Sequence, residues 1–263
     1  MNLKNICQST CDIAEQTAIF IAAQLEEVKT TDIQTKSLNS LVSYVDQEAE
    51  KQLVKALQAL IPTATFLTEE ETISTEEGEW QWIIDPLDGT TNFLHQLPFF
   101  SISLALLHQK EIVVGVVYEV MRKECFSAWK DGGAFLNGQK IQVSTRPTLG
   151  DSLIATGFPY YDYSKTKNYL EALAYFMRNT RGIRRLGSAA LDLAYVACGR
   201  FDAYYEYSLN PWDVAGGAIL VKEAGGSVCD FQGGNDYIYG KEIIAASPIV
   251  FEEIKSIIKT HFS

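Results

Sequence analysis

The sequence predicts a layered fold of the α/β or α+β class, in which helices and sheets alternate. Of its 263 residues, 47% are hydrophobic and 21% charged, proportions that are ordinary for a globular protein with a large core. Both halves of the chain alternate segments of helical periodicity with short apolar segments typical of strands. No linker, repeat or low-complexity segment separates them. We therefore expect residues 1–145 and 146–263 to form two halves of one compact unit that share a cleft.

The first half is predicted to begin with two helices and continue as strands. Apolar residues recur at three- and four-residue steps from Leu3 to Val28, which predicts a long amphipathic helix. A second helix is predicted from Asp46 to Leu60, and Pro62 closes it. Four apolar segments then predict strands, at residues 80–85, 99–107, 112–118 and 124–129. Turns are predicted at residues 131–133 and 137–138.

The second half alternates strands and helices. Strands are predicted at residues 152–156, 201–206, 227–230 and 242–246. Helices are predicted at residues 166–178, 188–198, 212–224 and 249–259. Gly225-Gly226 ends the third of these helices. Helices and strands therefore form layers in this half too.

Charge and composition exclude several classes of function. The net charge of −11 and the pI near 4.8 disfavour a broad nucleic-acid-binding surface, so no direct nucleic-acid partner is expected. The first 16 residues lack the apolar core of a signal peptide, and the longest apolar segment, residues 112–118, is too short to span a bilayer. Five scattered cysteines without metal-binding spacing suit reduced thiols. We expect a cytoplasmic protein with no membrane partner.

The stretch WIIDPLDGTTNF, residues 82–93, carries the clearest functional pattern. An apolar strand leads directly into Asp85 and Asp88, although aspartate is depleted in strands. Two acids that face one cleft repel each other unless a proton or a cation lies between them. Mg²⁺ prefers oxygen ligands, and a pair of such ions can activate water and stabilise a leaving oxygen. The pattern therefore favours a metal site.

The residues after these acids suit phosphate. Gly89 allows the backbone to approach an oxyanion, and the N–H groups that begin a short helix at Thr90 bind phosphate well. Two further acidic positions, residues 69–71 and Asp213, also lie at the ends of predicted elements. Simpler interpretations of both stay open: a solvated charged segment for residues 69–71, and a capping box begun by Asn210 for Asp213.

Two motifs in this order, DPLDGTTNF and NPWDVAGGAILVKEAGG, resemble the signature motifs of the inositol monophosphatase family. The likeness covers essentially the whole chain, and residues 187–206, GSAALDLAYVACGRFDAYYE, are most similar to the bacterial and animal enzymes. The resemblance implies a layered αβαβα fold, often a homodimer. It also implies two Mg²⁺ ions per subunit, with a third left open, and inhibition by Li⁺.

The resemblance also assigns roles to individual residues. It implies metal ligands at five positions: Glu69, Asp85, the backbone carbonyl of Leu87, Asp88 and Asp213. The catalytic residues it implies are Glu69, Thr90 and Asp88, with Glu69 and the Thr90 hydroxyl orienting the attacking water. Contacts to the substrate are implied for the backbone amides of Gly89 and Thr90, and for Ala189, Glu206 and Asp213.

The chain departs from the family pattern at two positions. Ser40 replaces a common aspartate, which puts a third metal ion in doubt, and Thr68 replaces a glycine before the metal-binding glutamate. Asp46 matches an acidic position near that third ion, but an ordinary acid at a helix start is an equal interpretation. His95 is expected on the surface. Arg184-Arg185 is expected to attract anions, face a partner subunit or form a solvated edge, and Tyr204-Tyr205 to pack across a strand.

The function expected from these residues is Mg²⁺-dependent hydrolysis of inositol monophosphate, or of a similar small polyol phosphate, by an activated water. No nucleophilic side chain lies in the motifs, so no phosphoenzyme is expected. One alternative keeps the chemistry and changes the substrate to fructose bisphosphate, a phosphoadenosine nucleotide or histidinol phosphate. Another alternative is a regulatory protein that binds the transcription machinery.

Overall fold

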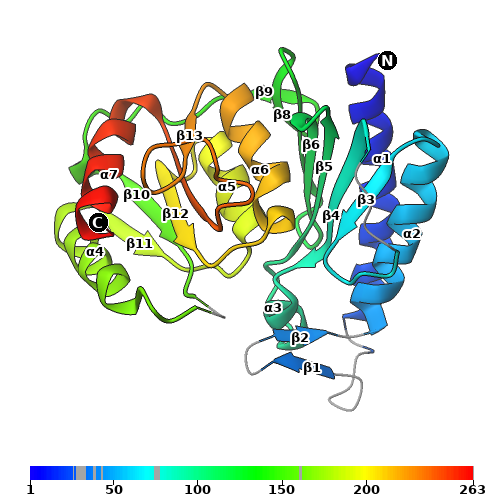
Figure 1. Ribbon diagram of the computed structural model, residues 1–263, viewed down its shortest axis with the longest axis horizontal. Coiled ribbons are helices and arrows are strands. Elements are labelled where there is room, and N and C mark those ends of the chain that lie inside the picture. Colours follow the sequence, from blue (N-terminus) through cyan, green and yellow to red (C-terminus); the bar gives the residue numbers. More distant parts are fainter. Residues whose placement is uncertain are drawn as a thin grey trace.

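The layers of the protein alternate helix, sheet, helix, sheet and helix, as Figure 1 shows. The computed structural model describes residues 1–25, 27, 34–37, 40–42, 44–73, 78–159 and 162–262. The predicted αβαβα layering is therefore confirmed.

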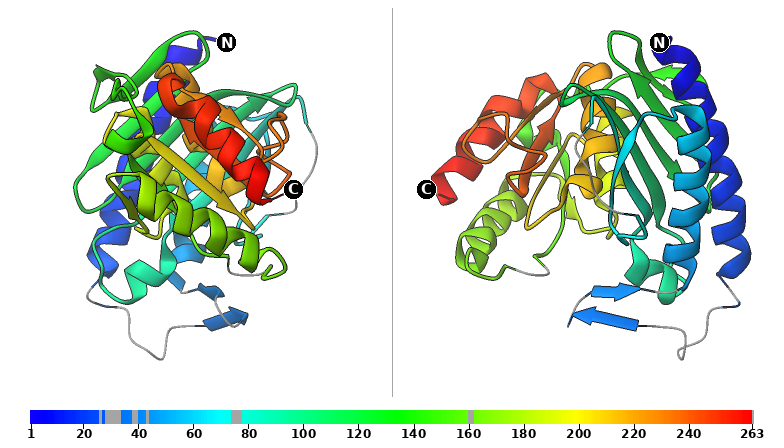
Figure 2. Two further views of the ribbon diagram at one scale, coloured as in Figure 1. Left: turned by 90° about the vertical axis from the view of Figure 1, so that its left-hand side faces the viewer. Right: turned by 45° about the vertical axis from the view of Figure 1, so that its right-hand side comes forward.

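The first sheet has seven strands in the order β3-β4-β5-β6-β7-β8-β9. Its strands are β3 Thr65–Thr68, β4 Trp80–Asp88, β5 Ser101–His108, β6 Glu111–Glu119, β7 Glu124–Trp129, β8 Gly133–Leu136 and β9 Gln139–Ile141. All neighbours are antiparallel except the parallel pair β3 and β4. Helices α1 (Leu3–Gln24) and α2 (Tyr44–Leu60) lie along its outer face and bury their apolar sides on it (Figure 2). Val28, the predicted end of the first helix, lies outside the described residues.

Strand β4 continues three residues beyond its predicted end, because a bulge carries it past Pro86. Asp85 pairs with Ser103 but Asp88 pairs with Ser101, so β4 has one residue more than its partner across this interval. On a regular strand, the side chains of residues i and i+3 point to opposite faces of the sheet. One extra residue between them places both side chains on the same face. The bulge therefore brings both carboxylates to the same side of the sheet. Proline is tolerated at a bulge because it needs no ladder donor there.

The second sheet has five strands in the order β11-β10-β12-β14-β13. They are β10 Leu153–Thr156, β11 Gly182–Arg184, β12 Ala203–Tyr207, β13 Ser227–Cys229 and β14 Glu242–Ala246. The outer face packs against α4 (Thr166–Asn179) and α7 (Pro248–His261), as both views in Figure 2 show. A hairpin of β1 (Gln34–Ser37) and β2 (Ser40–Val42) projects beside α3 (Thr90–Leu94) (Figure 1).

The middle layer consists of α5 (Ala189–Ala197) and α6 (Pro211–Glu223), which lie between the two sheets (Figure 1). Every residue of α5 is buried, as expected for a helix with protein on all sides. Glycines allow α6 to approach its neighbours. A Cβ atom at Gly115 of β6 would lie 2.7 Å from the carbonyl oxygen of Gly216, and one at Gly217 would lie 2.4 Å from Cβ of Leu193. These contacts set how closely α6 lies to β6 and α5.

Candidate active site

A pocket of about 120 Å³ lies where the bulge of β4 meets the first turns of α5 and α6. It contains all nine residues that the resemblance assigned to the site: Glu69, Asp85, Leu87, Asp88, Gly89, Thr90, Ala189, Glu206 and Asp213. Residues that were given no role also line it, including Gly157, Arg185, Ser188 and Asp192. The structure thus brings together side chains that are up to 144 positions apart, from Glu69 to Asp213.

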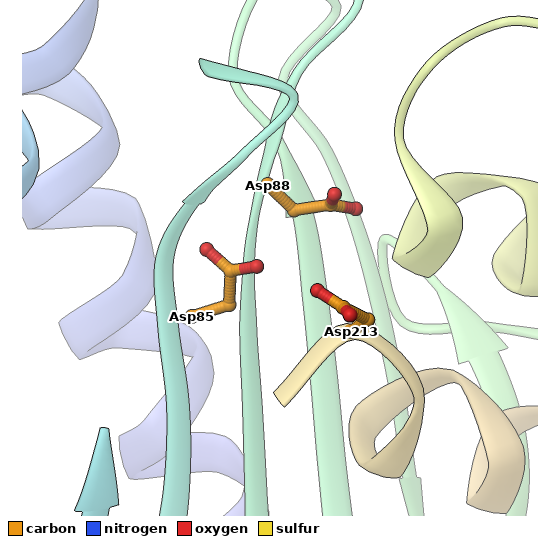
Figure 3. A group of neighbouring side chains, drawn as sticks. All are labelled: Asp85, Asp88 and Asp213. Carbon is orange, nitrogen blue, oxygen red and sulfur yellow. The ribbon is translucent and has the colours of Figure 1, made fainter. Parts of the chain in front are cut away.

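Three aspartates form the acidic centre of this pocket. Oxygen atoms of Asp85, Asp88 and Asp213 all lie within 4.8 Å of one another, and Figure 3 shows the carboxylates side by side. Burial raises the pKa of Asp85 well above its usual range, and the charges of Glu69 and the other two aspartates add to the effect. Burial and the charge of Asp88 do the same for Asp213. Protons or cations are therefore needed to hold these groups together.

Asp88 is fixed in place by the first turn of α5. Its Oδ2 accepts a hydrogen bond from the hydroxyl of Ser188 at 2.6 Å and another from the backbone N–H of Ala190 at 2.8 Å. Burial raises the pKa of Asp88 to about 6, while these hydrogen bonds oppose the rise. A carboxylate at a helix N-terminus is favoured by the helix dipole. Asp88 is therefore oriented before any ligand arrives.

Asp213 also completes the capping box that its sequence context suggested. Its Oδ2 accepts from the backbone N–H of Asn210 at 2.6 Å, in the position expected for the third residue of a helix that starts at Pro211. The same carboxylate faces Asp85 and Asp88. The two interpretations of Asp213 are therefore compatible, because the capping contact aims the side chain into the pocket.

Thr90 is joined to a helix from the far end of the first half. Its hydroxyl lies 3.0 Å from Oδ1 of Asp46 and 3.0 Å from the carbonyl oxygen of Leu87. Asp46 lies in the first turn of α2 and its side chain is only 1% exposed. Because a hydroxyl has one proton, only one of these acceptors receives it at a time. Thr90 itself lines the pocket, so this hydroxyl belongs to the site.

Two further acidic residues, Glu206 and Asp192, also line the pocket. Oε2 of Glu206 accepts from the hydroxyl of Tyr204 at 2.6 Å, so Tyr204 does more than the packing expected of it. Burial raises the pKa of Glu206 to about 7. Burial and the charge of Glu206 raise the pKa of Asp192 well above its usual range. A Cβ atom at Gly157 would lie 1.9 Å from Oε2 of Glu206, so only glycine leaves room for this carboxylate.

A sequence profile of the inositol monophosphatase family matches residues 3–261 of the chain. The chain belongs to this family. A putative Nus factor SuhB from Neisseria meningitidis serogroup B is 43% identical over 249 residues, 94% of each chain. An inositol-1-monophosphatase from Rhizobium meliloti is 41% identical over 240 residues, 91% of this chain and 90% of the relative. The crystal structure of extragenic suppressor protein suhB from Bartonella henselae superposes with a TM-score of 0.92 at 40% identity, covering 97% and 98% of the two chains.

Within this inositol monophosphatase family member, Glu50 holds the segment that follows Glu69. The Glu50 carboxylate accepts from the backbone N–H groups of Glu70 and Thr72, both at 2.8 Å, and from the Thr72 hydroxyl at 2.6 Å. Glu50 is fully buried on α2, one helical turn after Asp46. The i, i+4 spacing of two acids on the apolar face of a helix is the sequence signal that could have identified it.

The other marked residues lie as follows. His95 is exposed, as expected. Arg184 is exposed, whereas Arg185 lines the pocket with its guanidinium 5.3 Å from the ring of Phe158. Ser40 belongs to β2, and its side chain lies outside the described residues. Among the described helices, none is both long and apolar enough to cross a membrane.

Proposed function

We propose that this protein is a Mg²⁺-dependent phosphomonoesterase that hydrolyses inositol monophosphate or a similar small polyol phosphate. The observation that carries the proposal is the buried cluster of Asp85, Asp88 and Asp213 beside the glycine turn at Gly89. Membership of the inositol monophosphatase family supports the same reaction class.

The residues present fit Mg²⁺. The charged donors of the cluster are carboxylates, which hard divalent cations prefer, and a bound cation would offset the burial and mutual repulsion that raise the pKa of Asp85 and Asp213. Glu69, Asp85, the Leu87 carbonyl, Asp88 and Asp213 are the proposed ligands. Bound there, Mg²⁺ would supply the positive charge that activates a water and stabilises the leaving oxygen.

The remaining chemistry belongs to the side chains and backbone of the chain. Gly89 has a left-handed conformation, with φ of 95°, and precedes the first turn of α3, so its amide and that of Thr90 are proposed to bind phosphate oxygens. Glu69 and the Thr90 hydroxyl orient the attacking water, and Asp46 orients that hydroxyl. Glu206 and the backbone of Ala189 contact the polyol, with Asp213 between it and the phosphate.

A panel of phosphate-release assays tests this proposal. We expect the highest kcat/KM on inositol 1-phosphate, lower values on fructose bisphosphate, a phosphoadenosine nucleotide and histidinol phosphate, and no activity in excess EDTA. Activity that survives EDTA would overturn the metal requirement. A higher kcat/KM on one of the other substrates would transfer the assignment to that substrate.

A regulatory contact with the transcription machinery is the second candidate, because several relatives that are 39–43% identical are called Nus factors or putative Nus factors. The variant Asp88→Asn separates the two functions. If the regulatory function depends on a surface away from the pocket, the variant loses phosphatase activity and keeps that contact in a pull-down with RNA polymerase. No retention of polymerase by the wild-type protein would remove the second candidate.

The family resemblance also leads us to propose a homodimer and inhibition by Li⁺. Light scattering of the purified chain checks the first, with about twice the 29.3 kDa chain mass expected. Titration of LiCl into the phosphate-release assay checks the second.

A further inference from the structure

Three of the five cysteines lie together, far from the acidic pocket. Cys7 and Cys11 are on α1, and Cys125 is at the start of β7, 114 positions after Cys11. All three line a second cavity of about 700 Å³, between α1 and the strands that it covers. The two cavities share no lining residue. The sequence shows only scattered thiols here, and the fold brings them together.

Cys11 is the central member of this thiol cluster, which we define as Cys7, Cys11 and Cys125. Cys125 and Cys7 are the two groups that most strongly influence the titration of its thiol, and all three thiols line the same cavity. The Cys7 thiol is buried and also donates to the carbonyl oxygen of Ala128 at 3.6 Å. Cys11 and Cys125 are partly exposed to the cavity. These two thiols are therefore the ones that a small molecule in the cavity can reach.

Helix geometry decides which pair can be joined. Side chains four positions apart on a helix have Cβ atoms about 5–6 Å apart, whereas a disulfide requires about 3.5–4.5 Å. Cys7 and Cys11 could be linked only if the helix unwound. Cys11 and Cys125 lie on two different elements, α1 and β7, that pack together and present both residues to one cavity, so joining them does not require a helix to unwind.

The surroundings also give the thiols different reactivity. Hydrogen bonds from Cys125 and Cys7 lower the pKa of Cys11 below the usual range of a thiol. The same contacts and burial raise the pKa of Cys125 and of Cys7. Lys4 and Lys123 line the cavity as well. A thiolate that is accessible and next to a second thiol is the arrangement of a peroxide-reactive cysteine.

We propose that Cys11 and Cys125 form a hydroperoxide-reactive pair that closes to an intramolecular disulfide. The Cys11 thiolate attacks one oxygen of hydrogen peroxide, which breaks the O–O bond, forms a sulfenic acid and releases hydroxide that takes up a proton as water. The Cys125 thiol then attacks the Cys11 sulfur, forms the S–S bond and expels a second water. Two thiols are oxidised and one peroxide is reduced to two waters. A dithiol reverses the modification.

Thiol counting on the full-length protein tests the proposal. After treatment with hydrogen peroxide, we expect the loss of two of the five thiols, recovery with dithiothreitol, and a linked pair of proteolytic peptides that contain Cys11 and Cys125. The variants Cys11→Ser and Cys125→Ser should not form the link. Cys7→Ser is the matched control from the same cavity, and Cys229→Ser is the control from the second sheet; both should still form it.

Dimedone labelling distinguishes the two roles. In Cys125→Ser the sulfenic acid cannot be resolved, so dimedone should label Cys11; in Cys11→Ser it should label neither residue. A link between Cys7 and Cys11, a link between two chains, or unchanged thiol content after peroxide would overturn the proposal. None of these outcomes depends on phosphatase activity, since the readouts are thiols and peptide masses.

Discussion

The hydroxyl of Thr90 on α3 lies 3.0 Å from a carboxylate oxygen of Asp46 on α2, a contact between residues 44 positions apart. It joins a helix of the first layer to the turn that is proposed to bind phosphate. Asp46 does not line the pocket, so its effect on the reaction is transmitted by the threonine.

This contact gives the first prediction. Asp46→Asn preserves the shape of the side chain but removes the charge that orients the Thr90 hydroxyl. We expect kcat to fall by about 10²-fold or more, the lower end of the range for a positioned acid–base group, with KM little changed. Steady-state kinetics check this, and Glu48→Gln, an exposed position on the same helix, is the control. A loss confined to KM would contradict the positioning role.

The second prediction concerns Asp88. Asp88→Asn removes negative charge from the cluster of three aspartates while keeping an acceptor for Ser188. We expect kcat at saturating Mg²⁺ to fall by at least about 10²–10³, the scale for loss of one preorganised electrostatic group. The thermal midpoint reports whether folding is intact. Unchanged turnover in a folded variant would show that Asp88 is not part of the catalytic site.

The third prediction separates substrate recognition from catalysis. A hydrogen bond to a charged group contributes about 1.5–3 kcal/mol, which corresponds to roughly ten- to a hundredfold in kcat/KM. Glu206→Ala should therefore lower kcat/KM on inositol phosphate by that factor and leave an aryl phosphate without hydroxyls nearly unaffected. Comparison of the two substrates checks this. Equal losses on both would assign Glu206 to the fold, and no loss on either would refute a polyol contact.

The fourth prediction concerns pH and metal removal. Burial raises the pKa of Glu206 from 4.5 to about 7 and that of Asp88 from 3.8 to about 6. Between the ordinary pKa and the raised pKa of each group, the native state binds more protons than the unfolded chain. The free energy of unfolding of the metal-free protein therefore falls as pH rises from about 4 to about 7. One pKa unit corresponds to about 1.4 kcal/mol, and 1 kcal/mol moves Tm by roughly 2–4 °C in chains of 150–250 residues.

Thermal denaturation in EDTA should therefore show Tm falling by about 5 °C or more from pH 5 to pH 8. Added Mg²⁺ should raise Tm more at pH 8 than at pH 5, since the ions bind the deprotonated native site. A Tm that rises with pH in EDTA, or a Mg²⁺ effect that is equal at both pH values, would contradict this prediction.

The periodic segments predicted the layers, and the family motifs predicted nine residues that line the pocket, but Gly157, Ser188 and Asp192 were given no role. The bulge between Asp85 and Asp88 was not predictable, since it depends on how β5 pairs with β4. Strands of three or four residues, such as β11 and β9, are too short to show a period. Asp192 lies within an otherwise apolar helix, and only the packing of α5 shows that it faces the cavity. The division into residues 1–145 and 146–263 stays a prediction.

Because α6 lies very close to its neighbours at Gly216 and Gly217, the affinity of the proposed site for Mg²⁺ depends on the distance between this helix and the first sheet. Asp213 is carried by α6 while Asp85 and Asp88 are carried by the first sheet, so the width of the cluster is set by how tightly that helix is packed. A methyl group at Gly216 would meet Ser103 and Leu104 of β5, which would push the helix away from the first sheet and spread the carboxylates apart. A selection for variants that require more Mg²⁺ should therefore recover substitutions at packed interior positions such as Gly216, in addition to changes in the proposed ligands themselves.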